Sequence, residues 1–162
     1  MHLFFLILFC LLSGHHALAF SQCICPEEPP SIDEAYRQAF GVFTGTVIDI
    51  DQEYRPYRSK IRFAVEQSWK GVTYPEVSVY TSNHDAYSLI KQGITCGYSF
   101  RKGERYLVFS YRDHRQHGPA YVSTCSRTAP ITKAEEDIQR LGLPVHDFRK
   151  GDHLPGFLEQ NP

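Results

Sequence analysis

The sequence has almost no net charge and no segment in which one sign of charge predominates. Its 17 lysine and arginine residues are balanced by 18 aspartate and glutamate residues, which gives a formal net charge of -1. The basic surface with which nucleic-acid-binding domains neutralise phosphates is therefore not expected. The chain also lacks internal repeats and low-complexity blocks, and its 162 residues predict a single domain.

Catalytic motifs are absent as well. No HExxH, GxSxG or phosphate-binding glycine motif occurs. His84, His114 and His117 fall in expected polar loops, where solvated side chains explain them better than a catalytic cluster does. Each cysteine outside the leader has a candidate disulfide partner, so none is an obvious nucleophile. We therefore expect neither enzymatic activity nor a cofactor.

The longest apolar run, Leu3–Leu12, is too short to span a membrane as a helix. It is followed by Ala17-Leu18-Ala19, which matches the A-x-A cleavage site of a secretory signal peptide. A buried apolar strand is the alternative. We expect residues 1–19 to be a signal peptide, and the protein to be secreted or periplasmic. Residues 20–143 would then form the folded domain and residues 144–162 a flexible tail rich in proline, glycine and charge.

Four cysteines lie outside the leader: Cys23, Cys25, Cys96 and Cys125. An oxidising compartment favours disulfide bonds, and four cysteines allow three pairings. Cys23 and Cys25 are poor partners, because two residues of extended chain span roughly 7 Å between Cα atoms and the small ring would be strained. Two pairings remain: Cys23–Cys96 with Cys25–Cys125, or Cys23–Cys125 with Cys25–Cys96. A four-cysteine zinc site is a competing interpretation, although the paired C-x2-C knuckles of such sites are missing.

Strand signals dominate the middle of the chain. Ten tyrosines and eleven phenylalanines against one methionine suit the pleated surface of a sheet. The strongest alternation places Ile61, Phe63 and Val65 on one face, opposite a charged face. Trp69 is expected to close one end of the core, with Gly71 in the following turn. Five strands are predicted, over residues 42–51, 59–69, 76–81, 105–111 and 120–125, with a turn at 101–104; such short, closely spaced strands are typical of a small barrel or sandwich.

Two capping boxes predict short helices on either side of these strands. In Ser31-Ile32-Asp33-Glu34, Ser31 would be the N-cap and Glu34 would reach back to it, opening a helix that ends near Gly41. In Thr132-Lys133-Ala134-Glu135, Thr132 would open a helix that runs to about Leu141 and stops at Gly142.

Six short motifs carry a resemblance to a known family. They are C-I-C-P at residues 23–26, V-F-T-G-T-V at 42–47, S-W-K-G at 68–71, T-C-G-Y-S-F at 95–100, G-E-R-Y-L-V-F at 103–109 and C-S-R-T at 125–128. Together they resemble the amino-terminal domain of the tissue inhibitors of metalloproteinases, most closely the short bacterial versions. The resemblance covers roughly Cys23 to Leu143. It implies a five-stranded OB-type Greek-key barrel with flanking α-helices, and the disulfides Cys23–Cys96 and Cys25–Cys125.

The resemblance also implies a mechanism. The α-amino group and carbonyl oxygen of Cys23, as the mature terminus, would chelate the catalytic zinc of a target metalloproteinase and displace its attacking water. Ile24 would enter the main specificity pocket. Ile94, Thr95 and Cys96 would form a supporting loop beside this edge, which Cys25 and Pro26 continue. The protein would then be a monomeric inhibitor whose only metal contact is the zinc of its target.

The sequence departs from the family at three points. The A-x-A site leaves Phe20-Ser21-Gln22 ahead of Cys23, and a Cys23 nitrogen in an amide is a poor zinc ligand. Ile24 is bulkier than the small hydroxyl residue typical of these inhibitors, and the second, six-cysteine domain has no counterpart here. The alternative function is therefore a non-inhibitory, extracytoplasmic binding or structural module on the same fold.

Overall fold

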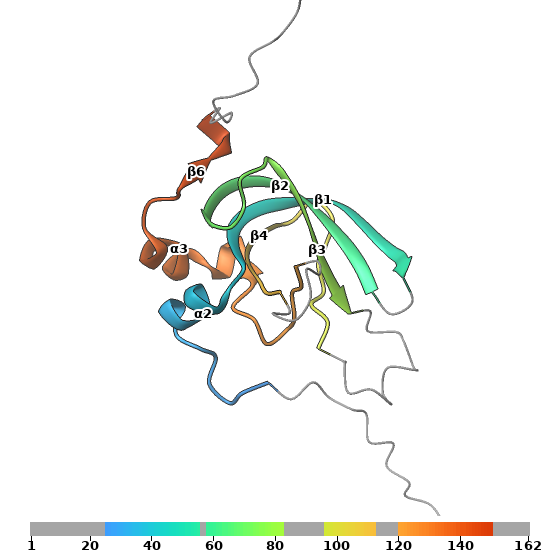
Figure 1. Cartoon of the computed structure of the whole chain (residues 1–162), viewed down its shortest axis with the longest axis horizontal. Coiled ribbons are helices and arrows are strands. Elements are labelled where there is room, and N and C mark those ends of the chain that lie inside the picture. Colours follow the sequence, from blue (N-terminus) through green and yellow to red (C-terminus); the bar gives the residue numbers. More distant parts are fainter. Residues whose placement is uncertain (1–24, 56–57, 83–95, 113–119, 151–162) are drawn as a thin grey trace, which may run out of the picture.

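The computed structural model describes residues 25–55, 58–82, 96–112 and 120–150. Within these ranges the chain forms a mostly antiparallel sheet of six strands and two short α-helices (Figure 1). The strands are β1 (Gly41–Arg55), β2 (Arg58–Lys70), β3 (Glu76–Ser82), β4 (Arg105–Ser110), β5 (Ala129–Pro130) and β6 (His146–Asp147). The helices are α2 (Ile32–Gln38) and α3 (Glu135–Leu141), with short 3-10 helices η2 (Ile131–Lys133) and η3 (Phe148–Lys150). The expected mostly-β fold with flanking helices is confirmed.

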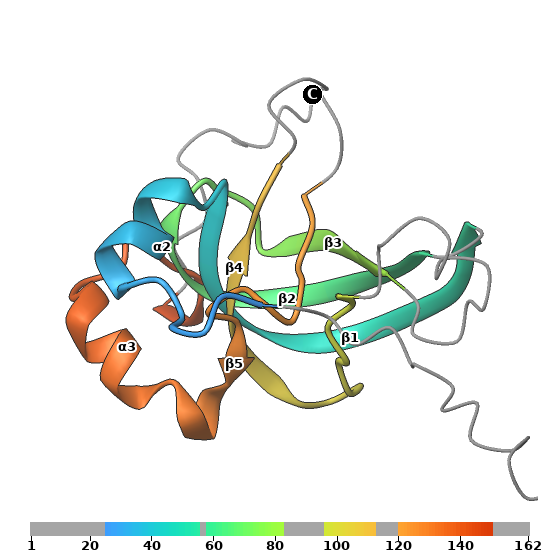
Figure 2. The same cartoon turned by 90° about the horizontal axis from the view of Figure 1, so that it is seen from below.

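The sheet curls so that the segment around Tyr121 joins β3 to the end of β4. Its strand order is β3-β2-β1-β4-β5, with β6 pairing the end of β2. Tyr80 of β3 pairs in parallel with Tyr121, and Tyr121 pairs antiparallel with Tyr111, directly after β4. Four backbone hydrogen bonds of 2.7–2.9 Å hold these bridges. Register shifts along β1 and β2 bend both strands, which gives the curvature seen in Figures 1 and 2. The result is a barrel-like body.

The two faces of the sheet contribute to two separate cores. Along β4, Tyr106 and Val108 point into the barrel, where they join side chains such as Phe63. The intervening Leu107 and Phe109 pack on the opposite face against a second cluster, formed with the helices. All four of these β4 side chains are buried, at no more than 2% exposure. A strand covered on both faces is continuously apolar, which explains why this stretch shows no alternation.

Helix α2 begins as the sequence predicts. Ser31 Oγ accepts a hydrogen bond of 3.3 Å from the backbone N–H of Glu34, so Ser31 is confirmed as the N-cap. The other half of the predicted capping box is not formed: the Glu34 carboxylate does not bond back to Ser31 but accepts a bond from Gln38 Nε2 at 3.1 Å. The helix ends at Ala39, and the N–H of Phe40 donates to Ser110 O at 2.7 Å, which leads the chain directly into β1.

Helix α3 begins later than its capping box predicts. Thr132 is not the N-cap: it lies inside η2, and Ala134 occupies the cap position without a side-chain hydrogen bond. The reason is that Pro130 and the residue before it pair with β4, and the chain then turns tightly through a bond from Ala134 N to Ile131 O. The end of the helix is as predicted, because Gly142 adopts a φ of 69° at its C-cap.

Three further predictions need correction. Residues 120–125 form isolated bridges rather than a continuous strand, and the short strands β5 and β6 were not anticipated. The body also extends past Leu143, where the tail was expected to begin. Val145 N donates to Ser68 O at 2.8 Å, and β6 pairs with Gln67 and Ser68. Residues 144–150 therefore belong to the body, while residues 151–162 lie outside the described part.

The end of β2 is arranged as expected. Trp69 is 4% exposed and its indole Nε1 donates to Gly142 O at 2.9 Å, which fastens α3 to the sheet. Gly71 has a φ of 68°, and a Cβ there would lie 2.1 Å from Phe40 O, so the turn requires glycine. Gly103 forms the predicted turn before β4 with a φ of 83°. Among the described residues, no helix has both the length and the apolar character needed to cross a membrane.

Candidate functional site

A disulfide bond fixes the start of the described chain to its distant C-S-R-T motif. Cys25 and Cys125, separated by 100 residues, are bonded with a Cα–Cα distance of 5.2 Å. The bond is one of the two predicted bonds of the Cys23–Cys96, Cys25–Cys125 arrangement, and it contradicts a Cys25–Cys96 pair. It also removes two of the four thiolates that a cysteine zinc site would need. Cys96 is disulfide-bonded as well, but the predicted partner, Cys23, lies outside the described residues.

The segment that carries Cys96 lies beside the segment that carries Cys125. The backbone N–H of Thr124 donates to Cys96 O at 3.0 Å, and Gly97 forms an antiparallel bridge with Ser123. Three motifs far apart in sequence, those containing Cys25, Cys96 and Cys125, therefore meet at one place. We call Cys25, Pro26, Cys96 and Cys125 the cysteine edge.

The Cys96 segment is held from its other side by the end of β3. A Cβ at Gly97 would lie 2.0 Å from Ser82 O, so only glycine permits this approach. The next residue is bound too, because Tyr98 N donates to Thr81 Oγ1 at 2.7 Å. Burial, followed by the proximity of Tyr106 and Glu104, raises the pKa of Tyr98 to about 12, so its phenol is neutral at physiological pH. These contacts leave the backbone after Cys96 little freedom to move.

Arg127 anchors the segment that follows Cys25. Its guanidinium makes a two-pronged ion pair with Asp137 of α3, at 3.0 and 2.6 Å, and its Nη1 donates to Pro30 O at 2.8 Å. Thr128 then closes the motif: its hydroxyl oxygen accepts from Phe109 N at 2.9 Å. The segment is thus tied by a disulfide at Cys25 and by a charged hydrogen bond at Pro30, while residues 26–29 between them are exposed.

Local sequence reasoning missed the contribution of Arg127. Its partners Asp137 and Pro30 are 10 and 97 residues away, so no short-range pattern points to them. The only available signal was the position of Arg127 inside the C-S-R-T motif. Three residues of the motif therefore stabilise the body. Cys125 forms the covalent bond, Arg127 binds the segment near the terminus and α3, and Thr128 binds β4.

Several predicted site residues lie outside the described part of the chain. They are Cys23, Ile24, Ile94 and Thr95, which were predicted to contact the protease. The signal peptide 1–19 and the histidines His84, His114 and His117 also lie outside the described residues. Pro26 is described and exposed. No cluster of three or more His, Cys, Asp or Glu side chains suited to a metal ion occurs in residues 25–55, 58–82, 96–112 and 120–150.

Comparisons with known proteins give no match: no protein-family model and no curated protein is similar to this chain at a significant level.

Proposed function

We propose that the protein is an exported inhibitor of zinc metalloproteinases, built on an OB-type barrel and acting through the terminus that carries Cys23. The observation that carries this proposal is the convergence of Cys25, Cys96 and Cys125 at one edge of the body. An inhibitor that inserts its terminus into an active-site cleft needs a terminus with fixed geometry. Chain termini are normally the most loosely held part of a domain, and here the chain is fastened at Cys25 and again at Pro30.

The strand pairing supports the OB-type assignment. An OB-fold is a five-stranded, partly open Greek-key barrel. Counting residues 120–123 as the fifth segment, the order around the barrel is β1, β2, β3, the 120–123 segment, β4 and back to β1. Residues 120–123 follow β4 in the sequence, but in the barrel they lie between β3 and β4. This crossover distinguishes the arrangement from a simple meander, in which neighbouring strands follow one another along the chain.

The chemistry of the proposed contact is that of a chelating amine. An α-amino group has an ordinary pKa of about 8, so a metal ion can displace its proton near neutral pH. The Cys23 nitrogen and carbonyl oxygen would bind the zinc of the protease together. Because the neighbouring Cys25 is held by its disulfide, the contact would form with little loss of conformational entropy, which favours tight binding.

A second candidate function is a binding or structural module without inhibitory activity. The observation that favours it is Phe20-Ser21-Gln22 between the A-x-A site and Cys23. In a chain that begins at Phe20, the Cys23 nitrogen is an amide, which does not chelate zinc. The barrel and its disulfides would then support a binding surface other than the Cys23 terminus.

One experiment separates the two candidates. The exported, non-reduced protein is analysed by intact mass and by sequencing of its first residues, and the same sample is titrated against the catalytic domain of a zinc metalloproteinase. The inhibitor proposal expects a chain starting at Cys23 and stoichiometric loss of protease activity. A chain that starts at Phe20 and leaves the protease fully active would support the binding module instead.

A further inference from the structure

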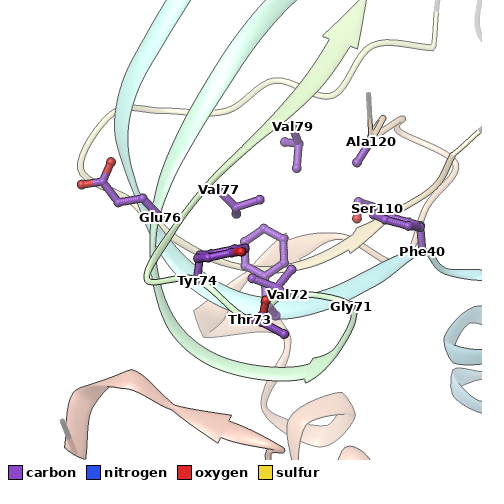
Figure 3. A pocket seen from close by; sticks show the side chains of 11 residues that line it. Phe40, Gly71, Val72, Thr73, Tyr74, Glu76, Val77, Val79, Ser110 and Ala120 are labelled. Carbon is purple, nitrogen blue, oxygen red and sulfur yellow. The ribbon is translucent and has the colours of Figure 1, made fainter. Parts of the chain in front are cut away.

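A small apolar pocket opens at the end of the barrel where β1 begins and where β2 turns into β3. Its volume is about 110 Å³. Phe43 and Val79, both 0% exposed, line it, and the lining residues Ala120 and Val72 are also buried. Figure 3 shows Phe40 on one side of the opening and Tyr74 and Glu76 on the other. No residue of the cysteine edge contributes to it, so it is a separate site.

Two exposed aromatic side chains lie at the rim of this pocket. The described residues include four large hydrophobic side chains classed as exposed, and two of them, Phe40 at 38% and Tyr74 at 65%, line the pocket. Ser110 adds no free donor, because its hydroxyl already donates to Gly41 O at 3.2 Å. Exposed aromatic side chains beside an apolar hollow are characteristic of the energetic centre of a protein interface.

The side of the rim that carries Phe40 is also preformed. Phe40 is held by its N–H bond to Ser110 O at 2.7 Å, and the Gly71 backbone packs directly against the Phe40 carbonyl. The guanidinium of Arg112 stacks on the Phe40 ring at 3.7 Å from its centroid. A rim fixed in this way does not have to be ordered when a partner binds.

The volume of the pocket limits which kind of group can bind in it. Sites for cofactors and metabolites usually enclose about 300–1,000 Å³, so about 110 Å³ is too small for them. A cavity of about 150 Å³ lined by apolar side chains accommodates benzene. The pocket is smaller than that cavity but open to the surface, so one aromatic ring can enter it in part and lie against the rim.

Charges on the two sides of the opening restrict the partner further. Glu76 lies on one side, with its carboxylate directed outward, and Arg112 lies on the other, stacked on the Phe40 ring. Neither takes part in an ion pair within the described part of the chain. We propose that this pocket binds one aromatic side chain of a protein partner, whose flanking residues present a basic group to Glu76 and an acidic group to Arg112.

The test uses the full exported chain, labelled with ¹⁵N, and four probes: the blocked tripeptides Lys-Phe-Asp, Asp-Phe-Lys and Ala-Phe-Ala, and free indole. Amide shifts of Val72, Val79 and Ala120 report binding. We expect one of the two charged peptides to bind at least about threefold more tightly than Ala-Phe-Ala, the size expected for exposed ion pairs. This preference should become weaker in Glu76→Gln, which keeps only the contact with Arg112.

Two variants show whether binding occurs in the pocket. Ala120→Leu fills it and should abolish the shifts, whereas Thr132→Leu places the same side chain at an exposed position of η2, outside the pocket, and should preserve them. Tyr74→Ser changes only an exposed rim residue, so it tests the site even if Ala120→Leu does not fold; it should weaken peptide binding several-fold. Absence of shifts with every probe, binding of indole without any peptide, or peptide binding that survives both Ala120→Leu and Tyr74→Ser would overturn the proposal.

Discussion

Removal of the Cys25–Cys125 bond tests how firmly the terminus is fastened. The bond closes a loop of 100 residues, and chain-entropy theory assigns such a loop about 4.7 kcal/mol. If Cys23 is bonded to Cys96 as predicted, the second link shortens the effective loop to about 31 residues and lowers the value to about 3.7 kcal/mol. We therefore expect Cys25→Ser combined with Cys125→Ser to lose between about 2 and 5 kcal/mol of unfolding free energy.

The assay is equilibrium unfolding in urea, monitored by the fluorescence of Trp69. With a slope of about 2 kcal/mol per molar urea, the midpoint should fall by roughly 1–2.5 M. Because the bond acts on the unfolded chain, the slope should stay equal or rise, and the amide spectrum of the folded barrel should persist away from the mutated sites. Chemical reduction is a poorer test, since it would also break the Cys96 bond. An unchanged midpoint would refute the reasoning.

Three further predictions concern the contacts that shape the site and its support. Arg127→Lys loses the two-pronged contact with Asp137 and should cost about 1–3 kcal/mol, whereas Arg140→Lys, in an exposed helix pair, should cost less than about 0.5 kcal/mol; equal midpoints in urea would contradict this. Gly71→Ala places a Cβ against backbone and should cost about 1–3 kcal/mol, more than Gly103→Ala, which has a positive φ but open space; the reverse order of midpoints would be inconsistent with the rim geometry. The arginine partner of Asp147 holds the pKa of that carboxyl well below its usual range. Unfolded chains therefore bind more protons than folded ones below about pH 4, and stability should fall there on acidification. Asp147→Asn should flatten this fall, and parallel pH curves of the urea midpoint for the two proteins would contradict the assignment.

The elements that the sequence predicted correctly are those that depend only on neighbouring residues. Alternation at Ile61, Phe63 and Val65 identifies the buried face of β2, and all three are at most 5% exposed. Ser31 and Gly142 mark helix ends through capping rules that need only neighbouring residues. Trp69 was expected to close the core because a lone tryptophan beside an apolar strand buries a large surface.

The predictions that failed depend on distant partners. Thr132 has the right spacing for a cap, but the pairing of Ala129 and Pro130 with β4 shifts the helix start past it. Residues 144–150 have the composition of a tail, but their pairing with β2 and the hydrogen bond from Gln67 Nε2 to Asp147 Oδ2 attach them to the body. Such contacts link residues about 80 positions apart, so no local pattern reveals them.

The cysteine edge could be predicted from the sequence only in part. Composition and spacing limited the four cysteines to two pairings, and the family resemblance implies Cys23–Cys96 with Cys25–Cys125; the structure shows the Cys25–Cys125 bond, and the Cys23–Cys96 bond stays a prediction. The contacts that order the edge, from Thr124 to Cys96 and from Arg127 to Pro30, could not be predicted, because they follow from how the barrel closes.

The most direct test of the account is a matched pair of proteins that differ by one residue at the amino terminus. One begins at Cys23 and the other at Gln22, and both are titrated against the catalytic domain of a zinc metalloproteinase after their disulfides have formed. The account predicts stoichiometric inhibition by the chain that begins at Cys23, and a loss of at least about 100-fold in affinity when Gln22 converts the chelating amine into an amide, equivalent to about 2.7 kcal/mol. Equal inhibition by both chains, or none by either, would contradict the proposal that Cys23 binds the zinc of the target.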